Sequence, residues 1–334
     1  MEVTIKDIAR IAGVSYSTVS KALNNSPLVK EGTKRKVLDI ANQMGYHPNM
    51  VAKSLVSKKS NTIGVVWPSV DRTVWSNLAT IINEKLKAYS YHMLLSINPV
   101  ESAVSLFNQL RVDAILVFGN DNQLDSTFSS IPILDYGPCE SYHHPIVNVN
   151  RRQAILKAVE HLYQLGHRKI AYIGDLSHKS RAQQEKYIGF TEGIMKFSLP
   201  SNPNMAIDTQ GHGIENGYQA VHKLLASSYQ ATGVICGSYE ITIGVIKAIK
   251  DAGLSIPENI SIVSYDNIPQ METLEIPVTA VGFPIDKVAE CIVESLLCLI
   301  DGTKIHPSLN EEPPLIKRLS TASPSKTCNN KKQE

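Results

Sequence analysis

Residues 4–24 read TIKDIARIAGVSYSTVSKALN, and this stretch predicts two short helices around a tight turn. Apolar residues recur at the i, i+3, i+4, i+7 spacing of one helix face, at Ile5, Ile8, Ala9 and Ala12. Thr4 and Asp7 have the spacing of a capping box at the start of the first helix. Gly13 can adopt the left-handed backbone that ends it, and Ser15 can cap the second helix.

A third apolar stripe follows and ends at Gly45; it consists of Val37, Ile40, Ala41 and Met44. Three short helices with a tight turn between the first two form a helix-turn-helix unit. In such a unit the helix over 16–24 enters the major groove of DNA with its N-terminal residues at the base edges. Ser17 can donate or accept a hydrogen bond there, and Lys21 can reach guanine acceptors or a phosphate. An ordinary three-helix bundle would show the same pattern.

The charge of the chain is unevenly distributed. Residues 1–60 carry ten Lys or Arg and four Asp or Glu, a net charge of +6, whereas the whole chain has +2, which leaves −4 for the remainder. A basic head on a mildly acidic body indicates a polyanionic partner for the head alone. A solvated basic face is the alternative that charge by itself leaves open.

A short helix with too little apolar surface to be stable alone is predicted after Pro48. It lies between the basic head and the rest of the chain, so we interpret residues 48–60 as a hinge. Leu55 can wedge between base steps in the minor groove and kink the duplex. Packing of Leu55 against the body of the protein is the alternative.

From Thr62 onward the pattern alternates between strands and helices, which predicts an α/β fold with parallel sheets covered by helices on both faces. The expected strands fall into two sets: 63–67, 92–95, 113–118, 131–134 and 146–149 in the first, then 169–174, 233–236 and 260–265 in the second. Two such sets predict two Rossmann-like lobes. Ligands of such folds bind outside the carboxyl ends of the strands.

Several stretches together resemble the lac repressor/galactose repressor (LacI/GalR) family of bacterial transcriptional regulators. They are residues 4–24, 45–55, 112–116, 165–174 and 257–267. The resemblance runs from about residue 3 to about residue 320. It implies an all-α helix-turn-helix head joined to a two-lobed core of the periplasmic-binding-protein type, with a ligand held between the lobes.

The resemblance also implies which residues contact DNA. Tyr16, Ser17 and Lys21 occupy the base-reading positions, and Leu55 is the minor-groove wedge. The full predicted set is Thr4, Ser15, Tyr16, Ser17, Thr18, Ser20, Lys21, Asn24, Tyr46, Asn49, Ala52 and Leu55. This sequence departs from the family at Lys21, where Arg is common, and at Lys30, where a Ser usually caps the third helix. A lysine gives up the bidentate fork of arginine.

The effector-binding residues that the resemblance implies are Ser69, Trp75, Tyr136, Lys186, His212, Tyr239, Asp266 and Phe283. Lys186 replaces a family Arg, Tyr239 replaces a usual Asp, and Asp266 matches a family Asp that accepts ligand hydroxyls or amines. Lys186 with nearby Arg181 favours an acidic or phosphorylated sugar. A cleft-wall role without ligand contact is the alternative for each residue. Trp67 and Trp75, the only two tryptophans, are both expected at the cleft.

The sequence therefore predicts a DNA-binding domain over 1–47, a hinge over 48–60, an effector-binding core over 61–320 and a disordered tail over 321–334. The first lobe is expected at about 61–156 plus 284–308, and the second at about 157–282 plus 309–320. We expect a cytoplasmic homodimer on a palindromic operator, regulated by a sugar, sugar acid or sugar phosphate, with no cofactor, metal site or membrane span. A sugar-binding module or a carbohydrate enzyme is the alternative, although no phosphate-loop, nucleophile-elbow or zinc-protease motif occurs. Release and strengthening of DNA binding by the ligand both stay open.

Overall fold

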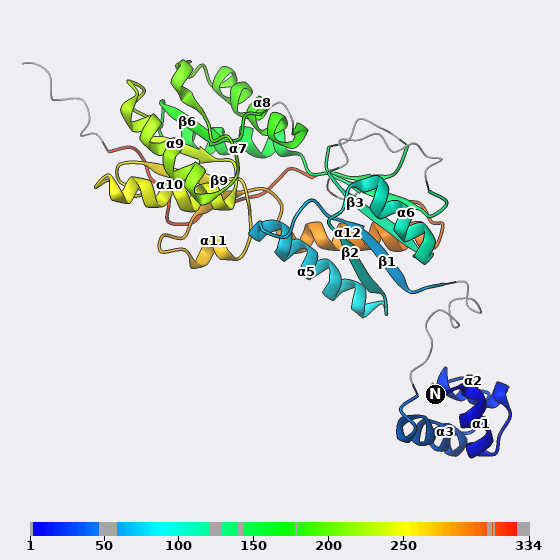
Figure 1. Ribbon diagram of the computed structural model, residues 1–334. Coiled ribbons are helices and arrows are strands. Elements are labelled where there is room, and N and C mark those ends of the chain that lie inside the picture. The colour runs from blue at the N-terminus through cyan, green and yellow to red at the C-terminus, as the bar shows by residue number, and fades with distance from the viewer. Residues whose placement is uncertain are drawn as a thin grey trace, which may run out of the picture. The chain divides into compact units, whose positions relative to one another are not determined.

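The computed structural model describes residues 3–46, 59–119, 129–138, 143–177, 180–305, 309 and 311–325. The chain divides into two compact units, Met1–Ser60 and Asn61–Glu334, which are called the head and the core (Figure 1). Residues 48–58, which are most of the predicted hinge, lie outside the described residues.

Over residues 3–46, the described part of the head, the chain forms the helices α1 (Ile5–Ala12), α2 (Tyr16–Leu23) and α3 (Glu31–Gln43). Thr4 and Asp7 form the predicted capping box, and Gly13 ends α1 in the left-handed conformation with φ of 68°. The Ser15 hydroxyl accepts a hydrogen bond from the Thr18 amide at 3.1 Å, so α2 begins as predicted. The helices enclose one apolar core formed by Ile8, Ala12, Val19, Ala22, Val29, Val37 and Ala41.

The first lobe of the core is built on a parallel sheet with the strand order β2-β1-β3-β4-β5. Its strands are β1 (Thr62–Val66), β2 (His92–Ser96), β3 (Ala114–Phe118), β4 (Ile133–Tyr136) and β5 (Ile146–Val147). Helices α5 (Thr73–Ala88) and α12 (Ile285–Ile300) pack on one face, and α6 (Val100–Leu110) packs on the other. Successive strand residues alternate between these two apolar layers, as the pleat requires.

The second lobe contains a six-stranded sheet with the order β11-β10-β9-β8-β6-β7, in which only β11 is antiparallel to its neighbour. Its strands are β6 (Ile170–Gly174), β7 (Ala206–Asp208), β8 (Gly233–Cys236), β9 (Ser261–Ser264), β10 (Thr279–Val281) and β11 (Leu315–Ile316). Its helices are α7 (Arg151–Gln164), α8 (Arg181–Lys196), α9 (Ile214–Ala226), α10 (Tyr239–Asp251) and the short α11 (Gln270–Thr273), with a 3-10 turn at Pro203–Met205. The predicted α/β class with two Rossmann-like lobes is confirmed.

Two helix pairs of the second lobe pack through glycines. A Cβ atom on Gly189 of α8 would collide with the Arg152 carbonyl oxygen of α7, and one on Gly244 of α10 would collide with the Ile214 carbonyl oxygen of α9. These backbones approach closely because glycine has no side chain. The α7–α8 pair covers one face of the sheet and the α9–α10 pair covers the other.

Two boundaries differ from the sequence expectation. The second lobe begins at Arg151, the first residue of α7, and not inside that helix at about 157, because α7 packs along its length on α8 and on the second sheet. The tail does not leave the core at 321. Ala322 exchanges hydrogen bonds with the Ser261 hydroxyl, and its carbonyl oxygen lies 2.9 Å from Nε2 of His167. These contacts attach residues 321–325 to the second sheet.

None of the helices within the described ranges has the length and apolar character needed to cross a membrane.

Candidate operator-binding and effector-binding sites

The outer face of α2 presents the predicted base-reading residues. Tyr16, Ser17 and Lys21 are exposed, while Val19 and Ala22 on the opposite face are buried in the core of the head. Because helical residues three and four apart share a face, burial of 19 and 22 turns 17 and 21 outward together. The head therefore presents hydroxyl and ammonium groups on one rigid helix face.

Hydroxyl groups gather at the N-terminus of α2. The Ser15 hydroxyl lies 2.9 Å from that of Ser17 and 2.8 Å from that of Thr18. Helix N-termini carry partial positive charge and unsatisfied amides, which suit a phosphate. Thr4 and Asn24 are exposed, and Ser20 and Tyr46 are partly buried; Asn49, Ala52 and Leu55 lie outside the described residues.

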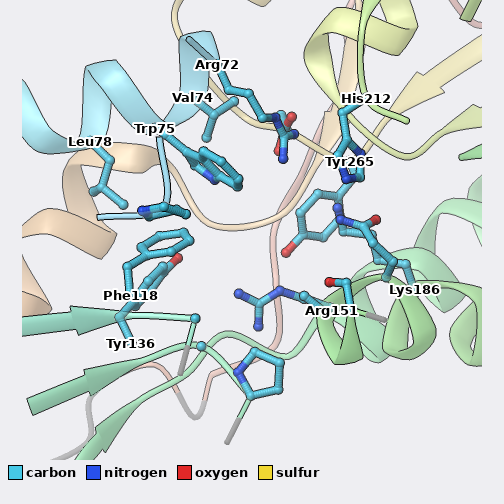
Figure 2. Close-up of a pocket in the computed structure, with 18 residues that line it drawn as sticks. Arg72, Val74, Trp75, Leu78, Phe118, Tyr136, Arg151, Lys186, His212 and Tyr265 are labelled. Atoms are coloured by element: carbon cyan, nitrogen blue, oxygen red, sulfur yellow. The ribbon is translucent and has the colours of Figure 1, made fainter. Parts of the chain in front are cut away.

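The core contains a cavity of about 310 Å³ lined by side chains from both lobes (Figure 2). The first lobe contributes an aromatic wall. The ring centroid of Phe118 lies 5.5 Å from that of Trp75 and 4.9 Å from that of Tyr136. Phe118 and Tyr136 are the last residues of β3 and β4, and Trp75 lies in the first turn of α5, the helix that follows β1. The three side chains therefore meet at the carboxyl edge of the first sheet.

The second lobe contributes a polar wall. Lys186 projects from α8 and is buried; its Nζ donates a hydrogen bond to the Gly237 carbonyl oxygen at 2.8 Å and lies 3.9 Å from the centre of the Tyr265 ring. Burial lowers the pKa of Lys186 to about 7, against the opposing influence of the Asp266 carboxylate. Asp266 itself accepts a hydrogen bond from the Tyr239 amide at 2.7 Å.

His212 stands beside this wall as a neutral ring. Its Nε2 lies 3.2 Å from Oδ2 of Asp175. Burial, assisted by the positive charges of Arg72 and Lys186, lowers the pKa of His212 to about 4. At neutral pH the imidazole is therefore uncharged, and Nε2 is the ring nitrogen that faces the Asp175 carboxylate.

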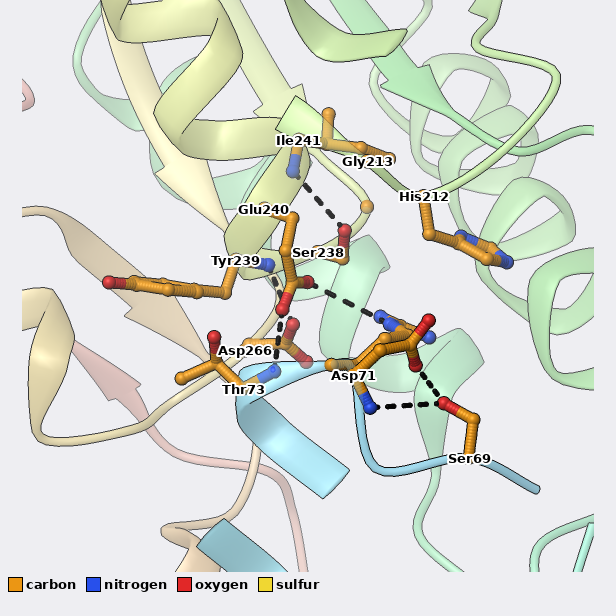
Figure 3. A network of polar contacts seen from close by, with 12 residues as sticks. Ser69, Asp71, Thr73, His212, Gly213, Ser238, Tyr239, Glu240, Ile241 and Asp266 are labelled. Atoms are coloured by element: carbon orange, nitrogen blue, oxygen red, sulfur yellow. Dashed lines mark hydrogen bonds and ion pairs between the residues drawn. The ribbon is translucent and has the colours of Figure 1, made fainter. Parts of the chain in front are cut away.

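The two lobes touch at the mouth of the cavity (Figure 3). Glu240 of α10 accepts a hydrogen bond from the Thr73 amide at 2.8 Å, and its other carboxylate oxygen lies 3.7 Å from Nε of Arg72. The Arg72 guanidinium also lies 4.5 Å above the Trp75 ring. The first turn of α5, which lacks a side-chain cap of its own, is thus capped by a carboxylate from the other lobe.

The structure brings five of the eight predicted effector residues together around this cavity: Trp75, Tyr136, Lys186, His212 and Asp266. Ser69 instead hydrogen-bonds to Asp71 in the loop before α5. Phe283 lines a smaller adjoining cavity of about 60 Å³. The Tyr239 side chain packs against the apolar core.

The expectation that both tryptophans lie at the cleft is wrong for Trp67. Its side chain is only 1% exposed and packs beneath Phe118, with ring centroids 4.6 Å apart, so only Trp75 lines the cavity. Burial follows from position, since Trp67 directly continues β1, which is covered on both faces.

Sequence reasoning missed six polar or aromatic residues of the cavity wall: Arg72, Phe118, Arg151, Ser180, Gln183 and Tyr265. Phe118 and Tyr265 were detectable, because each lies at the carboxyl end of a recognised strand. Arg72 directly precedes α5, and Arg151 is the first residue of α7; neither belongs to a recognised motif. Arg181 precedes Lys186 by five residues on α8 but is not part of the cavity wall.

Comparisons with known proteins agree with this architecture. Residues 4–49 match the family model described as bacterial regulatory proteins, lacI family, and residues 159–321 match the periplasmic binding protein-like domain. The chain is 32% identical over 309 residues to the probable HTH-type transcriptional repressor ExuR of Bacillus subtilis (strain 168), covering 89% of this chain and 92% of that protein. It is 30% identical over 299 residues to catabolite control protein A of Priestia megaterium, covering 84% and 90%.

The crystal structure of the Lac repressor dimer bound to operator and the anti-inducer ONPF has the same fold, with a TM-score of 0.81 and 24% identity over 96% of this chain and 100% of that chain. The head, the two-lobed core and these relatives all lead to one assignment. The chain belongs to the lacI family of bacterial regulatory proteins and is a DNA-binding transcriptional regulator.

Proposed function

We propose that this chain represses sugar-utilisation genes by binding a palindromic operator as a homodimer, and that a small ligand in the inter-lobe cavity controls this binding. The observation that carries the proposal is the cavity itself, which has an aromatic wall from one lobe and a polar wall from the other. Sugars stack their apolar faces on aromatic rings and hydrogen-bond through their hydroxyls. The ligand is a sugar, a sugar acid or a sugar phosphate.

In this proposal α2 enters the major groove, where Tyr16, Ser17 and Lys21 read base edges. The hydroxyl cluster at Ser15, Ser17 and Thr18 contacts a phosphate. The hinge, including Asn49, Ala52 and Leu55, reaches the minor groove between the two heads. Phosphate contacts make operator affinity fall steeply with salt.

Control by the ligand follows from the shared walls of the cavity. A ligand that touches Trp75 in the first lobe and Asp266 in the second has different contacts when the lobes move relative to each other. Such differential contact is what shifts a conformational equilibrium. The coupling is reciprocal, so operator DNA changes the ligand affinity by the same factor.

A tryptophan-fluorescence titration against neutral sugars, sugar acids and sugar phosphates tests the proposal. We expect a saturable change with one class of compound, because Trp75 lines the cavity while Trp67 is shielded from it. Trp75→Phe is the matched control and should remove the change while Trp67 still emits. Operator binding measured with and without that compound then gives the direction of control. If no compound alters the tryptophan fluorescence or the operator binding, ligand control through this cavity is refuted. DNA binding by the head is not refuted by that result.

The proposed homodimer has a candidate surface on the first lobe. Strand β2 is an edge strand, and Leu94, Leu95 and nearby Ile97 are exposed. An exposed apolar edge is a template for pairing with another chain. The charged variant Leu94→Asp is therefore expected to dissociate the dimer.

Sedimentation equilibrium of the Leu94→Asp variant should give a monomer, and its operator affinity should fall on the order of 100-fold because the two heads no longer bind as one unit. Ile188→Asp on α8 is the matched control, since Ile188 is 42% exposed and Leu94 is 40% exposed. A dimeric Leu94→Asp protein with unchanged operator affinity would exclude this surface.

We also propose that the protein acts in the cytoplasm and has no catalytic activity of its own. Within the described residues no cluster of His, Cys, Asp and Glu has the arrangement of a metal site. A ligand that is recovered chemically unchanged after prolonged incubation with the protein supports this view over a carbohydrate enzyme. A protein that binds the ligand but no DNA would instead be a simple sugar-binding module.

A further inference from the structure

The charged groups on the cavity wall are mostly positive. Arg72, Arg151 and Lys186 line it, while Asp266 is its only carboxylate among the lining residues that the structure describes. Carboxylates also stand behind the guanidiniums. A carboxylate oxygen of Glu240 lies 3.7 Å from Nε of Arg72, and a carboxylate oxygen of Glu185 lies 3.9 Å from Nη1 of Arg151.

The lining side chains by themselves therefore carry a small excess of positive charge. At most two positive charges remain on the wall after Asp266 is counted, and the carboxylates behind the guanidiniums reduce their field further. Lys186 is a weak contributor, since its Nζ is buried against a neutral carbonyl and an aromatic ring. Such a surplus matches one negative charge on a ligand better than the two of a phosphate monoester.

Arg151 is held so that its guanidinium faces the cavity. Nη1 donates two hydrogen bonds, one to Oδ1 of Asn148 at 2.7 Å and one to the Val149 carbonyl oxygen at 3.3 Å. Both bonds, and the approach to Glu185, use the same nitrogen. Figure 2 shows the guanidinium projecting from α7 into the space in front of the Tyr136 wall. The Nε–Nη2 edge is left as a planar fork that matches a carboxylate.

We propose that the ligand is a sugar acid with a single carboxylate, and that Arg151 is the specificity-determining residue that binds this carboxylate. The sugar ring then stacks on the aromatic wall of Trp75 and Phe118, and Asp266 accepts hydrogen bonds from its hydroxyls. This inference rests on the proposed function, because it assigns the chemical class of the ligand in the same cavity.

The test compares one hexose skeleton in three forms. Glucose, galactose and mannose are each titrated as the neutral sugar, the 6-carboxylate and the 6-phosphate, with Trp75 fluorescence giving Kd and operator binding as a second readout. For one of the three sugars the 6-carboxylate should bind at least about tenfold more tightly than both matched forms, as a charge-assisted bidentate pair predicts.

Variants of Arg151 test the residue itself. Arg151→Gln should remove that preference, so that the carboxylate and the neutral sugar bind alike. Arg151→Lys keeps the charge but not the fork and should retain only part of the preference. Arg152→Gln is the matched control, because Arg152 is the next residue on α7 but is exposed and paired with Glu192. It should bind like the wild type.

The outcomes separate the two levels of the proposal. Tightest binding of a neutral sugar or a 6-phosphate overturns the sugar-acid inference and leaves the proposed function standing. An unchanged preference in Arg151→Lys and Arg151→Gln overturns the role of Arg151 alone. If Arg151→Gln fails to fold, as judged by its thermal transition, the carboxylate preference of the folded Arg151→Lys protein tests the role of Arg151. Failure of all nine compounds to change fluorescence or operator binding overturns both the inference and ligand control through this cavity.

Discussion

Replacing Asp266 with asparagine is expected to abolish the response of operator binding to ligand while leaving operator binding by the ligand-free protein unchanged. Asp266 lies just beyond the carboxyl end of β9, lines the main cavity and its smaller neighbour, and is buried. One of its oxygens accepts the Tyr239 amide, so the other is the natural acceptor for a ligand hydroxyl. The head forms a separate unit of the chain and does not depend on this carboxylate.

The size of the effect follows from the chemistry of the substitution. Asparagine keeps the shape of the side chain but loses the charge and turns one acceptor into a donor. Hydrogen bonds to charged groups contribute about 1.5–3 kcal/mol each, and an unmatched buried polar group adds a further cost. Two such bonds correspond to a loss in ligand affinity on the order of 100-fold or more.

Operator affinity is measured as a function of ligand concentration in the wild type and in Asp266→Asn. Asp251→Asn is the control. Asp266 contacts the start of α10 at Tyr239, whereas Asp251 is the last residue of α10 and accepts a hydrogen bond from the Tyr218 hydroxyl on the protein surface. It should respond like the wild type. If Asp266→Asn reaches its half-maximal response at the same ligand concentration as the wild type, Asp266 does not bind the ligand.

The second large effect is expected from Ile8→Asp, which should unfold the head, eliminate operator binding and leave ligand binding intact. Ile8 is fully buried at the centre of the head core. An unpaired buried carboxylate costs several kcal/mol even when it becomes protonated. A unit of this size has a total stability of about 3–9 kcal/mol, so this one change is sufficient to unfold it.

Both tryptophans belong to the core, so the fluorescence titration of ligand reports on the core alone and should be unchanged in this variant. Circular dichroism should show a loss of helical signal equivalent to α1, α2 and α3. Ile11→Asp is the matched control on the same helix, because Ile11 is 53% exposed and its substitution leaves the core of the head untouched. Retained operator binding by Ile8→Asp, or loss of ligand binding along with it, would contradict the independence of the two units.

Most of the head could be predicted from the sequence because its determinants are local. The Thr4–Asp7 capping box, the left-handed Gly13 and the Ser15 cap are all found where their spacing places them. The missing cap at Lys30 was equally visible, and Lys30 makes no side-chain capping bond to α3. Each of these features depends on atoms within four residues along the chain, so no knowledge of the tertiary fold is needed.

The cavity was only partly predictable because it is assembled from distant segments. Trp75 and Asp266 were both expected in the ligand pocket, and both line the cavity: Asp266 follows the end of β9, and Trp75 lies in the first turn of α5, the helix after β1. Trp67 appeared equivalent to Trp75, yet it continues a strand that is covered on both faces and so lies beneath the wall. Nothing in the neighbourhood of Arg72 or Arg151 along the chain indicates a binding role.

The sequence by itself therefore determined the helix-turn-helix head, the α/β class of the core and the strands whose ends form the site, because hydrophobic periodicity and capping act over a few residues. Only the tertiary structure decided which side chains share the cavity. The chain passes between the lobes before α7, before α12 and again after α12, so residues of both lobes meet only once both sheets are packed. Arg151 faces the ligand space because α7 begins where the chain enters the second lobe, and that direction is a property of packing and not of its neighbours in sequence.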